Sequence, residues 1–511
     1  MARNVHTFGA SRLALLAAVC GLTGCAVSPV EFSTTRLAEI ADDKLARVTG
    51  DQEPIGRTVD LFEAMARAVK YNLDHQVELA EQALRERELE LAHYSLLPGI
   101  VAGSGYTARD KVNASSSRNA LTGLESLAVS TSQDQRLRAA DIAFSWNILD
   151  FGLSYVRARQ SADKVLVQAE LRRKVVLRIL EEVRTAYWRA ASAQRLQSRL
   201  DTVAMLAREA ESEARRVFGE RETSAITALT MERELVEVQR TLGEVRRELD
   251  TAKEQLAALI NVKPGTPYKV AAHRLGTPRL QAGNMQGLIK TALMNRPELR
   301  EVEYRKRINE QEAHAALLEM LPGAQLLAGA NFDSNSFLLH NNWVNWGAKA
   351  SWNLMRVFSI RARKDVIEQQ DDMLDKRSLA VTMAIMTQVY VSRARYASAT
   401  RDYRTAERYR NVQQKLLDQI RIEAGAGRIA RQTLVREELN AVVAEAKLDI
   451  AYAITQAALA NVQSSLGVDP PGVDAADGSS VAALAKALRG GPATAASGEF
   501  KTSWHAADAK R

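Results

Sequence analysis

Residues 141–149 read Asp-Ile-Ala-Phe-Ser-Trp-Asn-Ile-Leu, and residues 349–355 read Lys-Ala-Ser-Trp-Asn-Leu-Met. Each Ser-Trp-Asn triplet ends a stretch in which apolar and polar residues alternate, the pattern of a strand with two unlike faces. Each triplet is followed by a long segment without glycine or proline, which predicts a very long helix. This repeated combination of an amphipathic strand and a long helix is typical of a membrane barrel joined to a coiled coil, not of an enzyme.

The two halves of the chain, 58–270 and 280–470, repeat one order of elements. In each half the triplet Leu-Pro-Gly, at 97–99 and again at 321–323, ends a helix because proline cannot continue it. The elements expected in chain order are a helix from about 60 to 97, strands at 100–106 and 140–148 joined by an exposed loop at 107–138, helices at 153–218 and 223–260, strands at 324–332 and 344–354, a helix at 357–424 and a last helix ending near 466.

The alternation on the strands indicates a sheet with water on one side and lipid or protein core on the other. On the strand at 140–148, the apolar face includes Trp146 and the opposite face includes Asp141. Trp146, Trp346 and Trp352 all fall on apolar faces, where the aromatic girdle of a membrane barrel would place them. A half-buried strand of a soluble sheet shows the same alternation, and the tryptophans favour the membrane interpretation.

The N-terminal residues have the features of an exported protein. Positive charges precede an apolar run at 13–22, which is typical of a secretory signal. The run ends in Leu-Thr-Gly-Cys, which resembles a bacterial lipobox, so we expect a signal peptide at 1–24 and lipidation, with palmitate-type acyl chains, at Cys25. Residues 25–57 would then be a lipidated tether. By resemblance to other lipoproteins, Ala26 favours the outer membrane, and several acyl chains would anchor the chain firmly.

Four strands cannot close a barrel, and open strand edges leave hydrogen-bonding groups unpaired in hydrocarbon. Several copies must therefore join. Two copies give about eight strands, whose interior is filled by side chains, and three give about twelve, which leaves a lumen. The predicted fold class is an α+β membrane protein with two strand–helix repeats. Its trimeric 12-stranded transmembrane β-barrel is continued by a long periplasmic α-helical coiled-coil barrel.

Composition indicates no catalytic chemistry. The net charge of +8 comes from 69 basic and 61 acidic residues that are interspersed, which favours solvated helix faces over nucleic-acid binding. The seven histidines are scattered without ligand spacing, and the only cysteines are Cys20 and Cys25. We therefore expect no enzyme activity, cofactor or metal site. Residues 473–511 are rich in alanine, glycine and serine and are predicted to be a disordered tail.

An ordered set of short motifs, present in both halves, makes a resemblance specific. The set consists of Asn72 and Asn295, Leu97-Pro98 and Leu321-Pro322, Phe144–Gly152 at the start of the first long helix, Ala186-Tyr187 and Val389-Tyr390 within the long helices, and a glycine at each helical tip. With these features the chain resembles the TolC-like outer-membrane efflux channel family, in its outer membrane factor lipoprotein form, over nearly all of 58–470.

The resemblance implies a homotrimeric exit channel in the bacterial outer membrane, in contact with its lipid and extending into the periplasm. Its partners would be a periplasmic adaptor, also called a membrane fusion protein, and an inner-membrane pump of the resistance-nodulation-division type. Drugs or other small solutes would be the cargo. The alternative within the same fold is the outer-membrane duct of a type I protein or polysaccharide secretion system, and the sequence does not separate the two.

The resemblance also implies that the helical tips meet the adaptor. The tip residues singled out are Val217, Phe218, Gly219, Ile422, Gly425 and Gly427. Where many family members carry acidic residues that constrict the pore, this chain is basic, and the candidate constriction consists of Arg428, Arg431, Thr433 and Arg436. If these side chains face the lumen, three copies would form a positive constriction. The alternative is that the arginines face outward and pair with Glu437 or Glu438.

Overall fold

The computed structural model describes residues 29–50, 52–126, 128–219, 225–271, 284–429, 431–469 and 479–490. The chain divides into two units, Met1–Glu53 and Pro54–Arg511. The first contains helix α2 (Thr34–Arg47), whose first turn is capped by the Ser33 hydroxyl, which accepts a hydrogen bond from the Arg36 amide at 3.2 Å. The predicted signal peptide and the lipidation site at Cys25 lie outside the described residues.

The second unit contains the predicted four-stranded sheet. Its strands are β2 (Gly99–Ala108), β5 (Arg136–Asn147), β7 (Gly323–Asp333) and β8 (Asn342–Ser351). They follow the order β2-β5-β7-β8 and are antiparallel throughout. All four expected strands are therefore present. The segment expected as a loop also contains a small hairpin formed by β3 (Ala114–Ser115) and β4 (Ser130–Thr131).

Ten helices of this unit are described. They are α3 (Leu61–Tyr71), α4 (Leu73–Tyr94), α5 (Ile148–Gly219), α6 (Ala225–Asp250), α7 (Ala252–Leu259), α8 (Met285–Asn295), α9 (Pro297–Leu318), α10 (Arg356–Gly425), α11 (Arg431–Ser465) and α12 (Val481–Gly490). The long helices α5 and α10 contain 72 and 70 residues. At 1.5 Å per residue each is roughly 105 Å long.

Two of the predicted helices are divided in the structure. The helix expected from 60 to 97 breaks at Asn72, because its side-chain oxygen accepts from the Asp74 amide at 3.0 Å and so caps α4. The Asn72 amide group also donates to the Leu259 carbonyl oxygen at 3.1 Å, which ties the break to the end of α7. The helix expected at 223–260 is likewise divided into α6 and α7.

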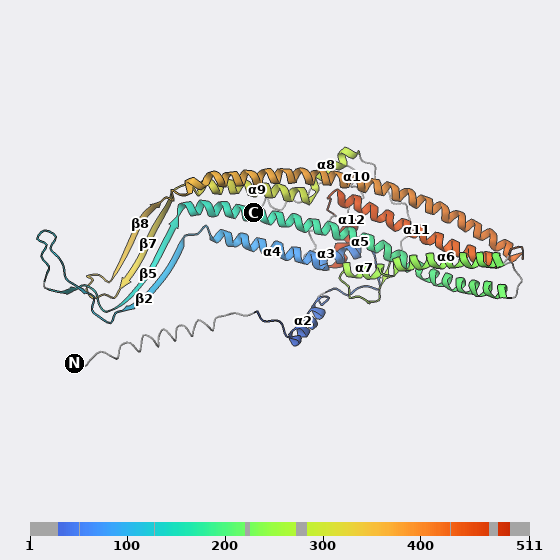
Figure 1. Ribbon diagram of the computed structural model, residues 1–511, viewed down its shortest axis with the longest axis horizontal. Helices are drawn as coiled ribbons and strands as arrows, with labels where there is room; N and C mark the ends of the chain where they lie inside the picture. Colours follow the sequence, from blue (N-terminus) through green and yellow to red (C-terminus); the bar gives the residue numbers. More distant parts are fainter. Residues whose placement is uncertain are drawn as a thin grey trace. The chain divides into compact units, whose positions relative to one another are not determined.

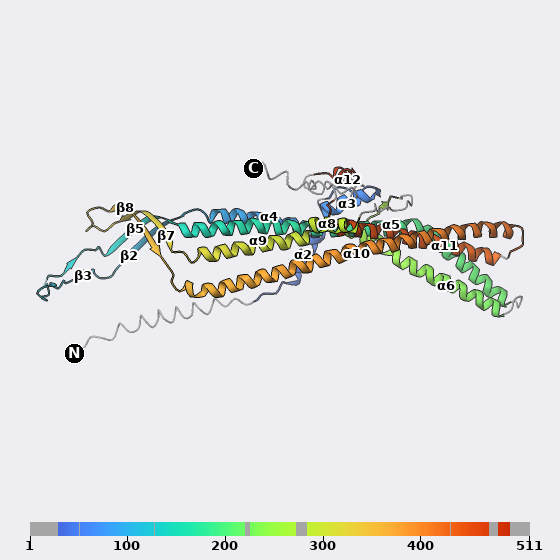
Figure 2. The same ribbon diagram turned by 90° about the horizontal axis from the view of Figure 1, so that it is seen from above.

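The helices of this unit form a layer that continues the sheet (Figures 1 and 2). Next to the sheet, α5 packs against α4 and α9, and α9 packs against α10. Towards the opposite end, α5 packs against α6 and α11, and α11 packs against α10. Helix α10 therefore continues the edge formed by β8, and α4 and α6 continue the edge formed by β2.

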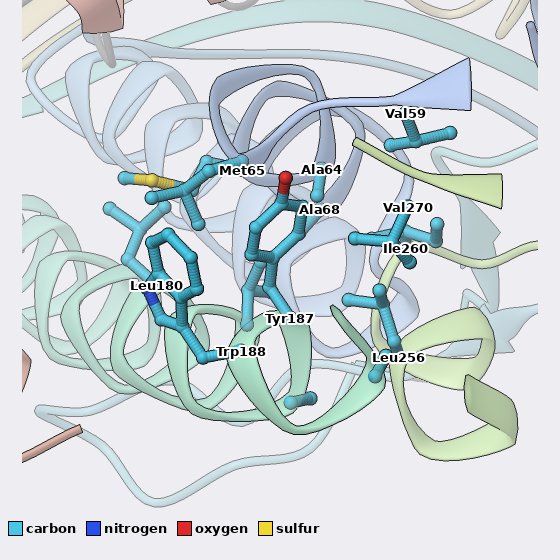
Figure 3. Close-up of a cluster of buried hydrophobic side chains, with 14 of the residues drawn as sticks. Val59, Ala64, Met65, Ala68, Leu180, Tyr187, Trp188, Leu256, Ile260 and Val270 are labelled. Carbon is cyan, nitrogen blue, oxygen red and sulfur yellow. The ribbon is translucent and has the colours of Figure 1, made fainter. Parts of the chain in front are cut away.

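A buried core lies part-way along the helices (Figure 3). Tyr187 of α5 is fully buried between α3 and the short parallel pair β1 (Thr58–Val59) and β6 (Lys269–Val270). Its hydroxyl donates to the Ala271 carbonyl oxygen at 3.2 Å. The neighbouring Trp188 packs edge-to-face on Tyr452 of α11, with ring centroids 5.2 Å apart. Burying each such side chain contributes about 1.5–3 kcal/mol, so this core joins the two halves of the chain.

The predicted disordered tail differs from the structure at α12. Helix α12 packs against α3, and it buries Val481, Leu484, Ala485 and Leu488 in the core that also contains Tyr187. Their spacing places them on one helical face. Within 473–511, the alanine-, glycine- and serine-rich composition hides this short apolar stripe, and the expectation of disorder is wrong for 481–490.

Candidate channel wall and constriction

The register of the sheet keeps polar residues together on one face. Asp141 of β5 lies opposite Gly103 of β2 and Asn331 of β7. The Asn331 amide donates to the Asn345 side-chain oxygen of β8 at 2.5 Å. A Cβ atom at Gly103 would lie 2.6 Å from the Asp141 carboxylate, so glycine leaves the room that this carboxylate occupies. The strands thus build a hydrophilic surface of the kind that lines an aqueous lumen.

The other face of the sheet is apolar and uncovered in the single chain. Phe144 of β5 lies opposite Ala328 of β7, which in turn lies opposite Trp346 of β8. Trp346 is 86% exposed and Val344 is 74% exposed. A contiguous apolar face of this extent marks a surface that meets lipid or another protein.

The three tryptophans proposed as a girdle take up different positions. Trp352 follows β8, and its indole N–H donates to the Met320 carbonyl oxygen at 2.9 Å. Trp146 ends β5 and packs edge-to-face on Phe151, with centroids 6.0 Å apart. These two lie at the end of the sheet that joins the helices, whereas Trp346 lies within its strand. The girdle stays a prediction.

The second helical tip is closed by a glycine with a left-handed backbone. Gly427 has φ of +71°. The Gly427 amide donates to the Ala424 carbonyl at 3.0 Å and the Arg428 amide to the Glu423 carbonyl at 3.0 Å. This is the Schellman arrangement that ends a helix. Ile422, one turn earlier, is exposed.

The first helical tip lies at the end of α5. Val217, Phe218 and Gly219 belong to the last turn of α5, and their side chains and the turn that follows lie outside the described residues. The contact of either tip with an adaptor stays a prediction.

The basic residues after the second tip are paired within the chain where their side chains are described. Arg428 forms an ion pair with Glu423 of α10, with a nitrogen–oxygen distance of 3.3 Å. Arg436 pairs with Glu234 of α6 at 3.2 Å and with Glu437 at 3.3 Å. The pair between Arg436 and Glu437 is one that the alternative for these arginines names, and whether they line a pore stays a prediction. Thr433 is half-buried, and the Arg431 side chain lies outside the described residues.

Sequence reasoning missed a buried ion pair between the two halves. Arg195 of α5 donates through Nε to the Asp449 carboxylate of α11 at 2.8 Å. Burial raises the pKa of Asp449, and the nearby guanidinium of Arg195 opposes that rise. One turn further along, Arg199 of α5 pairs with Glu445 of α11. The sequence contains a pattern that could have indicated this pairing. Basic residues four apart on one long helix, Arg195 and Arg199, match acidic residues four apart on another helix, Glu445 and Asp449.

Within the described parts of the chain, no helix combines the length and the hydropathy needed to cross a bilayer. Over the same residues, no group of three or more His, Cys, Asp or Glu side chains is placed to hold a metal ion.

Comparison with known proteins gives no sequence match and several structural ones. No protein-family model matches the chain, and no curated protein matches it. The open state of the Neisseria gonorrhoeae MtrE outer-membrane channel superposes with a TM-score of 0.63 at 15% identity, over 80% of this chain and 88% of MtrE. The Campylobacter jejuni CmeC outer-membrane channel superposes with a TM-score of 0.63 at 12% identity, over 86% of this chain and 93% of CmeC. This chain has the fold of the TolC-like outer-membrane channels.

A third structure of the same fold is the Vibrio cholerae outer membrane protein VceC, with a TM-score of 0.61 at 11% identity over 80% of this chain and 96% of VceC. The resemblance read from the duplicated motifs is therefore confirmed. At these identities the likeness establishes the fold, so assembly, cargo and partners are inferred separately.

Proposed function

We propose that the chain is an outer-membrane exit channel of a tripartite efflux system, a passive conduit for drugs or other small solutes. The observation that carries the proposal is a sheet with one hydrophilic and one uncovered apolar face, continued by a layer of very long helices, in the fold of outer-membrane channels. A hydrophilic face can line water while the apolar face meets lipid. Nothing in this role needs catalysis or a cofactor.

Assembly as a homotrimer is supported by the two edges of the chain. Unpaired strand edges at β2 and β8 cannot stand in hydrocarbon, so each must pair with the opposite edge of another copy. Three copies would give about twelve strands around a lumen.

The helices carry matching apolar seams at the same two edges. Tyr409, Val412 and Leu416 share one exposed face of α10, and Ile226, Leu229 and Val236 share one exposed face of α6. Val412 is 60% exposed and Ile226 is 79% exposed in the single chain. Both seams lie close to the helical tips, so an α10 seam of one copy can pack on the α6 seam of the next, as in a coiled coil.

The partners and the anchor belong to the same proposal. A periplasmic adaptor would meet the helical tips and connect the channel to an inner-membrane pump of the resistance-nodulation-division type. Acyl chains on Cys25 would hold the chain in the outer membrane. A duct for type I protein or polysaccharide secretion would use the same wall, and the order of neighbouring genes would distinguish it.

The proposal is tested by single-channel recording and electron microscopy of the purified protein. We expect a trimer in detergent that appears as a hollow elongated particle and conducts ions in planar bilayers. A double variant, Val412→Glu with Leu416→Glu, should release single subunits and abolish conductance, because it places carboxylates in the seam. The control is Val129→Glu, which replaces a more exposed apolar residue in the β3–β4 segment, away from the seam. A wild-type protein that is a stable single subunit without conductance would refute the proposal.

A further inference from the structure

The apolar face of the sheet ends in two arginines. In β5, Arg136 and Arg138 share the face of Ile142 and Phe144, because alternate residues of a strand point to one side. Arg138 lies opposite Tyr106 of β2, and Arg136 lies opposite Ala108. These positions are at the end of the sheet furthest from the long helices, where β5 continues into the β3–β4 hairpin.

Among the residues that the structure describes, neither guanidinium has a hydrogen-bond or ion-pair partner. Both side chains are exposed. The backbone there is already satisfied, since the Arg138 amide donates to the Ser334 hydroxyl at 2.8 Å and the Ser334 amide donates back to the Arg138 carbonyl at 2.9 Å. Asp134, which precedes β5, accepts hydrogen bonds from the Ser336 amide and hydroxyl.

The height of the two arginines matches the boundary of a bilayer. From Trp146 to Arg138 the strand spans eight residues, roughly 27 Å at 3.4 Å per residue. With the usual strand tilt of about 40°, this is about 20 Å along the membrane normal, close to the apolar band of about 25 Å on membrane barrels. The guanidinium groups would therefore lie at headgroup level, where a cation costs little. Tyr106, opposite Arg138, would lie at the same level, and Phe332, opposite Ala140, would lie closer to the hydrocarbon.

We propose that Arg136 and Arg138 form a binding site for the phosphate of an anionic lipid headgroup, at the loop end of the apolar face. Guanidinium groups bind phosphate oxygens through paired, charge-assisted hydrogen bonds. Apolar and aromatic neighbours on the same face would hold the acyl chains. The site rests on the proposed membrane-spanning role and adds a preferred lipid class to it, one copy of the site per subunit.

The test is lipid selectivity of the reconstituted oligomer, measured by electron paramagnetic resonance with spin-labelled phosphatidylglycerol and spin-labelled phosphatidylcholine. We expect the wild-type protein to immobilise the phosphatidylglycerol label about five- to thirtyfold more strongly, the effect of one to two basic residues near a lipid surface. The Arg136→Gln/Arg138→Gln variant should reduce this ratio to about one. The control variant, Arg109→Gln/Lys111→Gln, removes the same charge from the residues that directly follow β2, at the same end of the sheet but outside the face shared by Arg136 and Arg138, and should keep the preference.

Two results overturn the inference in different ways. Equal immobilisation of both labels by the wild type, or an unchanged ratio in the Arg136→Gln/Arg138→Gln variant, rejects the lipid site and leaves the membrane-spanning sheet standing. Absence of any immobilised lipid, with either label, rejects the proposed membrane-spanning function itself and the lipid site with it.

Discussion

Replacing Arg195 by alanine is expected to destabilise the chain strongly at pH 7 and weakly at pH 4. Arg195 pairs with Asp449, which is 1% exposed. Without the guanidinium, the Asp449 carboxylate must remain charged in a buried site or take up a proton. Protonating a carboxyl with an ordinary pKa of 3.8 costs about 1.36 kcal/mol for each pH unit above that pKa. At pH 7 the loss of unfolding free energy caused by the unpaired carboxylate therefore cannot exceed about 4.4 kcal/mol.

The expected loss lies below that bound. Arg199 and Arg410 also lower the pKa of Asp449, and they would partly compensate for the missing charge. Breaking a buried pair by removing one partner costs about 3–5 kcal/mol in general, so we expect about 2–4 kcal/mol here at pH 7. At pH 4 the same bound falls to about 0.6 kcal/mol, because the pH then lies close to the ordinary pKa of 3.8 and about two-fifths of the carboxyl is already protonated in the unfolded chain.

The measurement is unfolding of the detergent-solubilised protein, followed by circular dichroism, for wild type and variant at both pH values. A carboxyl whose folded pKa is raised lowers stability in full above that folded pKa, and the loss disappears as the pH falls to the ordinary, unfolded pKa of 3.8, so the difference between the two proteins should shrink as the pH falls. Adding Asp449→Asn to the Arg195→Ala variant supplies the control, because a neutral amide carries no uncompensated charge and should restore most of the loss at pH 7. An equal loss at pH 4 and pH 7 would refute the electrostatic reasoning and assign the effect to lost packing of the arginine stem.

Three further predictions concern the constriction, a backbone turn and the core. Replacing Arg431 and Arg436 by alanine should shift single-channel selectivity towards cations if these residues line the pore, and an unchanged preference would reject the basic constriction. Gly467→Ala should destabilise the fold by well over about 1 kcal/mol in a thermal unfolding assay, because Gly467 has φ of +66° and an added Cβ would lie 2.8 Å from the Arg296 backbone. Tyr187→Phe should cost about 0.5–1.5 kcal/mol at neutral pH. That cost should diminish above pH 10, since burial raises the pKa of Tyr187 from its ordinary 10.0 while tyrosines of the unfolded chain ionise; a constant difference would contradict this.

The strands and long helices were predictable because their residues obey simple periods. Alternation ending at Trp146 places a strand there, and after Gly152 no glycine or proline interrupts the segment until the tip at Gly219. The structure extends β5 back to Arg136 and begins α5 at Ile148, which shifts the predicted ends without changing the elements.

What the sequence did not reveal depends on contacts between distant segments. Asn72 divides α3 from α4 because its side chain caps one helix and bonds to Leu259 far along the chain, and a helical period continues across it without interruption. Helix α12 is stable because Leu484 and its neighbours find a buried surface on α3. The pairing of Arg195 with Asp449 requires knowing that α5 and α11 lie side by side.

The continuity of strand and helix along one edge has a consequence for how copies would join. Helix α10 follows β8 after a short connection, and α4 leads into β2 after another, so strand pairing and helix packing at a subunit boundary are mechanically linked. A pairing error of two residues would displace the attached helices by roughly 7 Å, more than one helical turn of 5.4 Å. Misaligned copies would therefore lose their helical contacts as well as their strand alignment. A misaligned assembly would thus be less stable at two separated places along the subunit boundary.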